Sequence, residues 1–307
     1  MQVRVLGAAA GGGFPQWNAN SEASRRARHG DPMARPATQA SIAVSSDGRR
    51  WLLVNASPDL RQQIEAQPAL QPKDGLRSTP IAAVVLTNGD VDAVAGLLHL
   101  REGTPFALYA HPKVLAVLDS NPIFEVVDRS LVPRRGLPTD GHTIVMDAAE
   151  RDLGIRIVPF LAPGKLPLYL EGGSEELDTA AMDGDTLGLE IEAGGGRLLY
   201  VANCAQLTDA LLDRVAGADV LFLDGTLWCD DEMIVQGVGR KTGRRMGHIS
   251  MSGPDGAIER LARVPMGRRI FIHVNNTNPA LLADSPERAA IERAGWEVAF
   301  DGMELSL

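Results

Sequence analysis

The order of strand-like and helix-like stretches is the feature that most restricts the fold of this chain. Strand patterns occupy 2–7 and 40–57, and strands and helices then alternate over 58–121. A second group of strands covers 155–201, and alternating helices and strands follow it over 209–294. Two such halves favour two sheets packed face to face with helices outside. The sequence therefore predicts a four-layer αββα sandwich that forms one domain over 1–307, rather than one doubly wound parallel sheet.

Four local predictions follow from the same patterns. A helix is expected over 91–103, directly after a buried strand, and it ends at a glycine. A strand is expected over 166–173 and a helix over 254–264. The last residues, 296–307, have the pattern of a strand hairpin.

Composition excludes several classes of function. The 307 residues are 45% hydrophobic and 22% charged, which is typical of a globular protein. A net charge of −9 disfavours nucleic-acid binding, and the basic runs at 24–30 and 239–245 are interpreted as solvated loops. No apolar segment reaches membrane-spanning length and no signal peptide is evident, so we expect a cytoplasmic protein without a membrane partner. Cys204 and Cys229 are too few for a disulfide framework.

A glycine-rich loop, LGAAAGGGFP, follows the first strand. It lacks the G-x-G-x-x-G spacing, and the Pro-Gln-Trp-Asn that comes next does not begin a helix that holds a pyrophosphate. We therefore expect no dinucleotide cofactor, and we interpret the loop as one that needs positive φ or close backbone approach.

The stretch TNGDVD at 87–92 gathers polar side chains where a buried strand ends. Asn88, Asp90 and Asp92 offer three oxygen ligands from one short loop, and divalent cations accept such ligands. A structural interpretation competes, because Asn-Gly-Asp is ordinary turn chemistry and Asp92 stands where a helix N-cap is expected.

Other strand ends favour the metal interpretation. Asn203 follows the strand LLYV, Asp224 ends VLFLD, and His273 ends the strand IFIH. His248 lies in a glycine-flanked loop, MGHIS. Asn, Asp and His side chains at several strand ends are typical of a metal site. The other four histidines are interpreted as structural: His29, His99, His111 and His142.

These motifs resemble the metallo-β-lactamase superfamily, whose T-H-x-H-x-D-H signature follows a strand and begins a helix. Asn88 and Asp90 stand where that signature has two histidines, Asp92 matches its aspartate, and Ala93 replaces a further histidine. The resemblance also aligns Asn203 with a bridging aspartate and His273 with the last metal histidine. By resemblance, His248 matches a histidine that does not bind metal. We therefore expect the fold of this superfamily and an altered metal set of Asn88, Asp90, Asp92, Asn203 and His273.

Within the superfamily, GGGFPQWN, LTNGDVDAVAGLLHLREG and FDGMEL resemble the coenzyme PQQ (pyrroloquinoline quinone) synthesis protein B family over essentially the whole chain. Many members of that family carry cysteines after the Trp-Asn pair, in the pattern of a structural zinc site. This chain has Ala19, Ser21 and Ser24 there, so we expect no structural zinc.

The resemblance implies an Fe(II)-dependent oxygenase that hydroxylates the tyrosine ring of a small Glu–Tyr-derived PQQ precursor. Aspartate and histidine ligands with open positions resemble a non-haem iron environment. His248 is expected to act in acid–base chemistry and Asp224 to orient a ligand or bind the metal. Two alternatives stay open: a non-catalytic carrier or transport protein for PQQ or its precursor, and a metal-dependent hydrolase. Homodimerisation is a further hypothesis.

Overall fold

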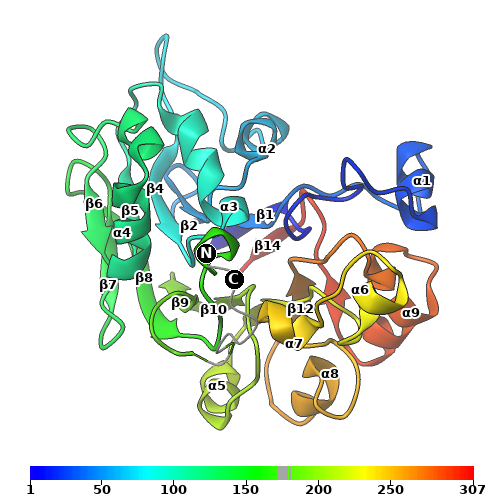
Figure 1. Ribbon diagram of the computed structural model, residues 1–307. Coiled ribbons are helices and arrows are strands. Elements are labelled where there is room, and N and C mark those ends of the chain that lie inside the picture. Colours follow the sequence, from blue (N-terminus) through cyan, green and yellow to red (C-terminus); the bar gives the residue numbers. More distant parts are fainter. Residues whose placement is uncertain (172–178, 180) are drawn as a thin grey trace.

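Two seven-stranded sheets form the framework of the protein, in a computed structural model that describes residues 1–171, 179 and 181–307 (Figure 1). Sheet I has the strand order β14 (Glu304–Ser306), β1 (Gln2–Gly7), β2 (Ser41–Ser45), β3 (Trp51–Val54), β4 (Ile81–Leu86), β5 (Ala107–Ala110), β6 (Arg134–Gly136). Sheet II has the order β13 (Glu297–Val298), β12 (Arg268–Ile272), β11 (Val220–Asp224), β10 (Gly196–Val201), β9 (Leu187–Ala193), β8 (Asp152–Leu161), β7 (Thr143–Met146).

Helices cover the outer face of each sheet. Sheet I is covered by α2 (Leu60–Ala66), α3 (Val91–Val94), α4 (Pro112–Ser120) and the 3₁₀ turns η1 (Ala95–Leu100) and η2 (Pro122–Val126). Sheet II is covered by α5 (Asp209–Val215), α8 (Ala257–Arg260), α9 (Pro286–Arg293) and η4 (Pro279–Leu281). The remaining short helices lie in the loops: α1 (Glu22–Arg28), η3 (Leu168–Leu170), α6 (Glu232–Val235) and α7 (Gly243–Met246). These layers confirm the predicted αββα sandwich.

Strand alternation divides the apolar residues between three cores. In β3, Leu52 and Val54 point into the core between the sheets, while Trp51 and Leu53 point toward the helices over sheet I. In β11, Phe222 faces the central core. Because these strands are buried on both faces, they read in the sequence as continuous apolar runs.

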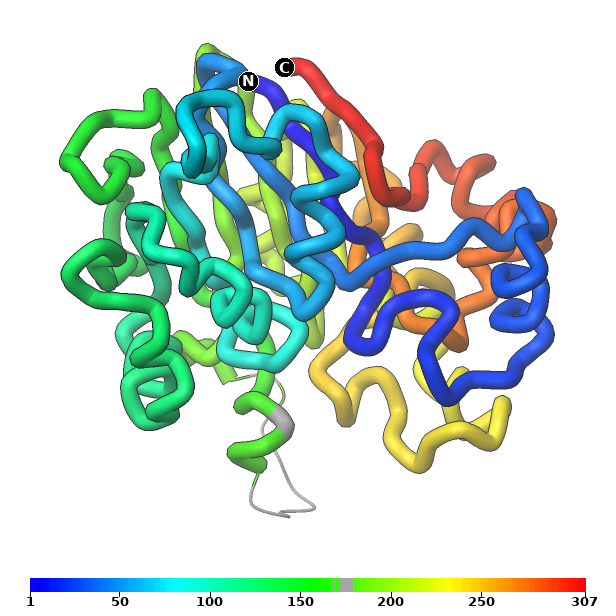
Figure 2. The backbone as a smooth tube through the Cα atoms, turned by 90° about the horizontal axis from the view of Figure 1, so that it is seen from above, coloured from blue at the N-terminus to red at the C-terminus, as the bar shows by residue number. Residues whose placement is uncertain are grey.

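The two ends of the chain meet at one end of the sandwich. Figure 2 shows them side by side, and the Met1 ammonium donates a hydrogen bond to the Leu307 carbonyl at 2.6 Å. The predicted C-terminal hairpin is wrong, because β13 pairs in parallel with β12 in sheet II whereas β14 pairs antiparallel with β1 in sheet I. An apolar pattern shows that a strand forms but not which neighbour it pairs with.

Two predicted helices are shorter than expected. The stretch 91–103 forms only α3 and η1, because the Ala93 carbonyl and the Gly96 N–H bond to the backbone of Ala56 instead of continuing an α-helix. Asp90, not Asp92, is the N-cap residue of α3, and its side chain makes no cap hydrogen bond. The stretch 254–264 is helical only at α8, after which Val264 N–H bonds to the Leu261 carbonyl, three residues back.

The strand predicted over 166–173 is replaced by η3. The Leu170 N–H bonds to the Pro167 carbonyl, which closes a 3₁₀ turn. Residues 172 and 173 of that prediction lie outside the described residues. Within the described part of the chain, no helix has the length and apolar character needed to cross a membrane.

Candidate metal and catalytic site

The carboxyl ends of strands from both sheets meet at one edge of the sandwich. Strands β10, β11 and β12 run parallel, so Asn203, Asp224 and His273 emerge at the same edge of sheet II. The end of β4 in sheet I is joined to this edge, because the Leu187 N–H donates to the Thr87 carbonyl at 2.8 Å. The loop after β4 therefore faces the strand ends of sheet II.

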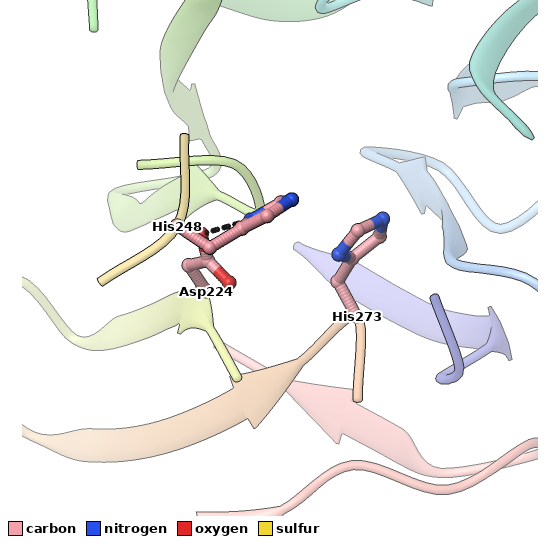
Figure 3. A group of neighbouring side chains, drawn as sticks. All are labelled: Asp224, His248 and His273. Atoms are coloured by element: carbon pink, nitrogen blue, oxygen red, sulfur yellow. Dashed lines mark hydrogen bonds and ion pairs between the residues drawn. The ribbon is translucent and has the colours of Figure 1, made fainter. Parts of the chain in front are cut away.

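Asp224 is a fully buried carboxylate that orients His248. Its Oδ2 lies 2.7 Å from His248 Nδ1 (Figure 3). The same oxygen accepts the Cys204 N–H at 2.8 Å. Since the carboxylate accepts, the ring donates from Nδ1, and Nε2 is left as the basic nitrogen. Figure 3 shows that nitrogen at the far end of the ring from Asp224. A base held by a carboxylate in this way is typical of acid–base catalysis.

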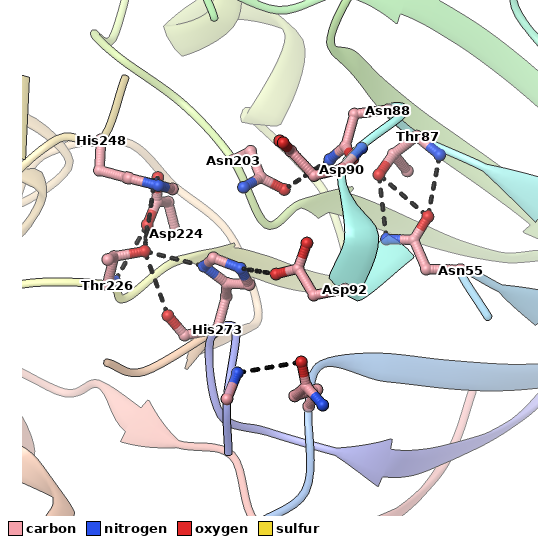
Figure 4. A network of polar contacts seen from close by, with 12 residues as sticks. Asn55, Thr87, Asn88, Asp90, Asp92, Asn203, Asp224, Thr226, His248 and His273 are labelled. Carbon is pink, nitrogen blue, oxygen red and sulfur yellow. Dashed lines mark hydrogen bonds and ion pairs between the residues drawn. The ribbon is translucent and has the colours of Figure 1, made fainter. Parts of the chain in front are cut away.

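Thr226 connects the two histidines. Its Oγ1 lies 3.1 Å from His248 Nδ1 and 2.9 Å from His273 Nδ1, and it donates to Asp224 Oδ1 at 2.7 Å (Figure 4). The two imidazole rings are stacked, with centroids 5.4 Å apart. Thr226 is thus a residue of this candidate site that was not predicted from the sequence. The signal available was its position two residues beyond the strand-end aspartate.

Asp92 and His273 form the second polar pair. Asp92 Oδ2 lies 3.0 Å from His273 Nε2. Burial by itself would raise the pKa of Asp92, but the hydrogen bond and charge of His273 hold that pKa below its ordinary value. Burial by itself would lower the pKa of His273, whereas Asp92 raises it above its ordinary value. His273 also has a φ of 63°, a conformation that non-glycine residues rarely adopt, so the fold holds this ring in place against backbone strain.

The remaining predicted ligands are Asn88, Asp90 and Asn203. Hydrogen bonds within this part of the site already occupy the side chains of Asn88 and Asn203. The Asn88 amide donates to Asn203 Oδ1 at 3.1 Å, and Asn88 Oδ1 accepts the Asp90 N–H at 2.9 Å. Asp90 is half-buried and its side chain has interactions of its own. Asn88 therefore shapes the loop that carries Asp90 and Asp92.

Two overlapping sets of side chains are compatible with a metal ion. One oxygen of Asp224 and one ring nitrogen each of His248 and His273 lie within 4.8 Å of one another. The Asp92–His273 pair is the second set, and His273 belongs to both. Carboxylate oxygens and imidazole nitrogens are the donors that zinc and other divalent transition metals accept.

A cavity of about 920 Å³ opens over these groups. Asp90, Asp92, Asn203, His248 and His273 all line it. Its other lining residues include five polar side chains that were not predicted to belong to the site: Lys165, Tyr169, Thr226, Arg240 and Lys241. The basic run at 239–245 is therefore not merely a solvated loop, because two of its side chains lie on the wall of this cavity.

Comparison with known proteins gives a consistent result. Residues 50–274 match the beta-lactamase superfamily domain. The chain is 56% identical over 304 residues to a coenzyme PQQ synthesis protein B of Gluconacetobacter diazotrophicus, with 98% of each chain covered. It is 53% identical over 307 residues to one of Methylorubrum extorquens, with both chains fully covered.

Solved structures agree with the fold. The crystal structure of Zn(2+)-bound PqqB from Methylobacterium extorquens superposes with a TM-score of 0.95 at 52% identity over the whole of both chains. A diphosphatase of the PhnP family superposes with a TM-score of 0.69 at 20% identity, covering 99% of this chain and 96% of the other, and shows a shared fold only.

The cofactor prediction requires correction. Fe(II) without structural zinc was expected, but the similar protein of known structure is bound to Zn(2+). That comparison points to zinc rather than Fe(II) as the bound metal, and it does not support the expectation that zinc is absent. The error has a physical origin, because carboxylate and imidazole donors suit several divalent metals and their identities alone do not select among them.

Proposed function

Because the chain belongs to the coenzyme PQQ synthesis protein B family of the metallo-β-lactamase superfamily, we propose that it is a metal-dependent enzyme of PQQ biosynthesis. Its substrate is a small Glu–Tyr-derived precursor, and its reaction is hydroxylation of the tyrosine ring. The observation that carries this proposal is the pairing of His248 with buried Asp224 on a cavity that also holds the Asp92–His273 pair.

Zinc is the metal we propose, and the donor set fits it. Asp92 and His273 would hold the ion, because their donor atoms are only 3.0 Å apart and face the cavity, and Asp90 lines the same cavity. When bound, zinc supplies a Lewis acid that polarises an oxygen of the substrate. Thr226 holds the other ring nitrogen of His273 at 2.9 Å, which fixes the orientation of that ring.

The chain's own acid–base group is His248. Its Nε2 would accept the proton of the substrate phenol, and Asp224 would stabilise the imidazolium that forms. Removing that proton makes the ring more electron-rich and prepares it for the added oxygen. Hydroxylation replaces a ring hydrogen with a hydroxyl group that takes its oxygen from O₂, while two electrons and two protons from a reductant convert the second oxygen atom to water. Zinc is redox-inert, so it would act only as the Lewis acid, and the electrons would come from the ionised ring and the added reductant. The test therefore supplies both O₂ and a reductant.

The test is a product assay on purified protein loaded in turn with zinc and with other divalent ions. A Glu–Tyr peptide, O₂ and ascorbate are added, and O₂ consumption is followed together with product mass. A product with one added oxygen, formed by the zinc-loaded wild type and not by zinc-loaded His248→Ala, supports the proposal, whereas product formed only with another ion would contradict the choice of zinc. Tight binding of an unchanged peptide would instead make the protein a carrier, and peptide cleavage without O₂ consumption would make it a hydrolase.

A further inference from the structure

The cavity has a second wall whose chemistry differs from that of the metal and catalytic groups. Three cationic side chains line it, from two loops: Lys165 between β8 and η3, and Arg240 and Lys241 between α6 and α7. We call these three residues the cationic wall. The acidic residues that line the same cavity, Asp90 and Asp92, both lie on the loop after β4.

Glu171 holds the two lysines of the cationic wall in place. Lys165 Nζ donates to one of its oxygens at 2.6 Å and Lys241 Nζ donates to the other at 3.0 Å. The Glu171 side chain is only 8% exposed. Burial by itself would raise the pKa of Glu171, but both lysines together hold it below its ordinary value. The Glu171 carboxylate thus pairs with two ammonium groups, so Glu171, Lys165 and Lys241 together carry a net charge of one positive unit.

Arg240 adds a second positive charge. Within the described part of the chain its exposed side chain makes no ion pair and no hydrogen bond. A guanidinium group presents a planar fork of donors that matches a carboxylate. Counting only residues that the structure describes, the cationic wall therefore carries two positive charges more than its acidic partner Glu171 balances, which suits a ligand with two carboxylates.

The cationic wall is also close to the catalytic groups. The aliphatic part of the Lys165 side chain packs against Gly247, because a Cβ atom added to that glycine would lie 3.3 Å from Lys165 Cγ. His248 directly follows Gly247 in the chain. Four residues beyond Lys165, the Tyr169 hydroxyl donates to the Gly89 carbonyl at 2.6 Å, directly before Asp90. The segment 165–171 thus spans the cavity from the side of His248 to the side of the metal loop.

We infer that the cationic wall is a carboxylate-binding subsite, with Arg240 as its principal contact, and that it selects small substrates with two carboxylate groups. This inference rests on the proposed function. The subsite anchors the acidic end of the substrate, so that its phenol reaches His248 and the metal.

The test compares the binding of two ligands by titration calorimetry. One is the dipeptide Glu–Tyr, which has two carboxylates, and the other is the same dipeptide with both carboxylates amidated. The variants are Arg240→Gln, Arg240→Lys and, as a matched control, Arg244→Gln, an exposed arginine of the same segment that does not line this cavity.

We expect Arg240→Gln to bind the dipeptide about 10-fold more weakly, as befits the loss of a charge-assisted contact at an exposed position. Arg240→Lys should fall between it and the wild type, and Arg244→Gln should equal the wild type. The amidated ligand should bind weakly and equally to all four proteins, since the carboxylate that Arg240 recognises is gone.

Two results would overturn the inference in distinguishable ways. If the wild type hydroxylates the dipeptide but Arg240→Gln binds it unchanged, the subsite is wrong and the proposed function stands. If the wild type binds neither ligand and forms no product, the proposed function fails and the inference fails with it.

Discussion

Asp92 is the residue whose replacement separates metal binding from folding. Asp92→Ala removes a carboxylate 3.0 Å from His273 Nε2, at a half-buried position on the cavity. We expect the variant to lose bound zinc and to retain its circular dichroism spectrum. Zinc content by mass spectrometry of the purified protein gives the measurement. Full zinc occupancy in the variant would remove Asp92 from the ligand set.

His248 is expected to serve the reaction rather than to hold the metal. His248→Ala should keep its zinc and lower kcat by roughly 100-fold to 10,000-fold, the range typical of a general acid–base group. His99→Ala, an exposed histidine on η1, is the control and should behave as the wild type. Loss of zinc from His248→Ala would place His248 among the ligands, as its distance to Asp224 and His273 also permits.

The residues with a strong chemical signature were predictable from the sequence. Asp92, Asp224, His248 and His273 each stand at a strand end or in a glycine-flanked loop, and the structure brings all four together. Thr226 was not predictable in the same way, because a threonine side chain acquires its role only from the hydrogen bonds around it. Its contacts join groups more than 20 residues apart in the chain.

At the scale of elements, a buried hydrogen-bonded pair fixes the end of β4. The Asn55 amide and the Thr87 hydroxyl lie 3.0 Å apart, and Asn55 Oδ1 accepts the Thr87 N–H at 2.9 Å. Asn55 has a φ of 64° and is itself held by this contact. The pair therefore positions the loop that follows Thr87, which carries Asp90 and Asp92.

Thr87→Val is expected to destabilise this strand end. It removes the hydroxyl and leaves a buried amide donor unsatisfied, at a cost of about 1–3 kcal/mol in the free energy of unfolding. Zinc affinity should fall too, because the loop after β4 is less well fixed. Urea denaturation and zinc titration provide the measurements, and Thr87→Ser, which keeps the hydroxyl, is the control. Unchanged stability in Thr87→Val would show that the pair does not anchor the loop.

Elements were predictable where local and tertiary preferences agree. The apolar runs of β4, β11 and β12 could form only buried strands, and their ends coincide with the site. The stretch 91–103 deviates because Ala56 takes two of its backbone hydrogen bonds, and the partners of β13 and β14 depend on contacts across the whole chain. Neither the backbone hydrogen bonds to Ala56 nor the pairing partners of β13 and β14 can be predicted from a local sequence pattern.

At the scale of the whole molecule, one buried carboxyl group should affect the pH dependence of stability. Burial raises the pKa of Glu232 from 4.5 to about 7, although Thr277 and the Trp228 N–H donate to its oxygens. Because the folded protein favours the neutral form, this group contributes most below pH 4.5, and that contribution is lost as pH rises toward 7.

Glu232→Gln should remove that part of the pH dependence. From about pH 5 to about pH 8, the wild type should lose up to about 3 kcal/mol of unfolding free energy relative to the variant, since each pKa unit corresponds to about 1.4 kcal/mol. Denaturation curves at several pH values measure this difference. A constant offset between the two proteins across that range would contradict the shifted pKa.

The four-layer architecture was predictable because two successive halves each bury a sheet under helices. We propose that both halves fold as one domain, since residues from both sheets share the central core and the ends of the chain bond to each other. The metal was not predictable, because the donors that suit zinc also suit other divalent ions. The cationic wall was missed because its two loops come together only in the fold.

The position of the bound metal tests the central claim most directly. Crystals of the protein loaded with zinc are measured on both sides of the zinc absorption edge, and the anomalous difference map locates the ion. The expected result is a peak in contact with the side chains of Asp92 and His273, on the cavity that His248 lines. A map with no peak at this site, or with zinc bound only elsewhere on the chain, would contradict the assignment.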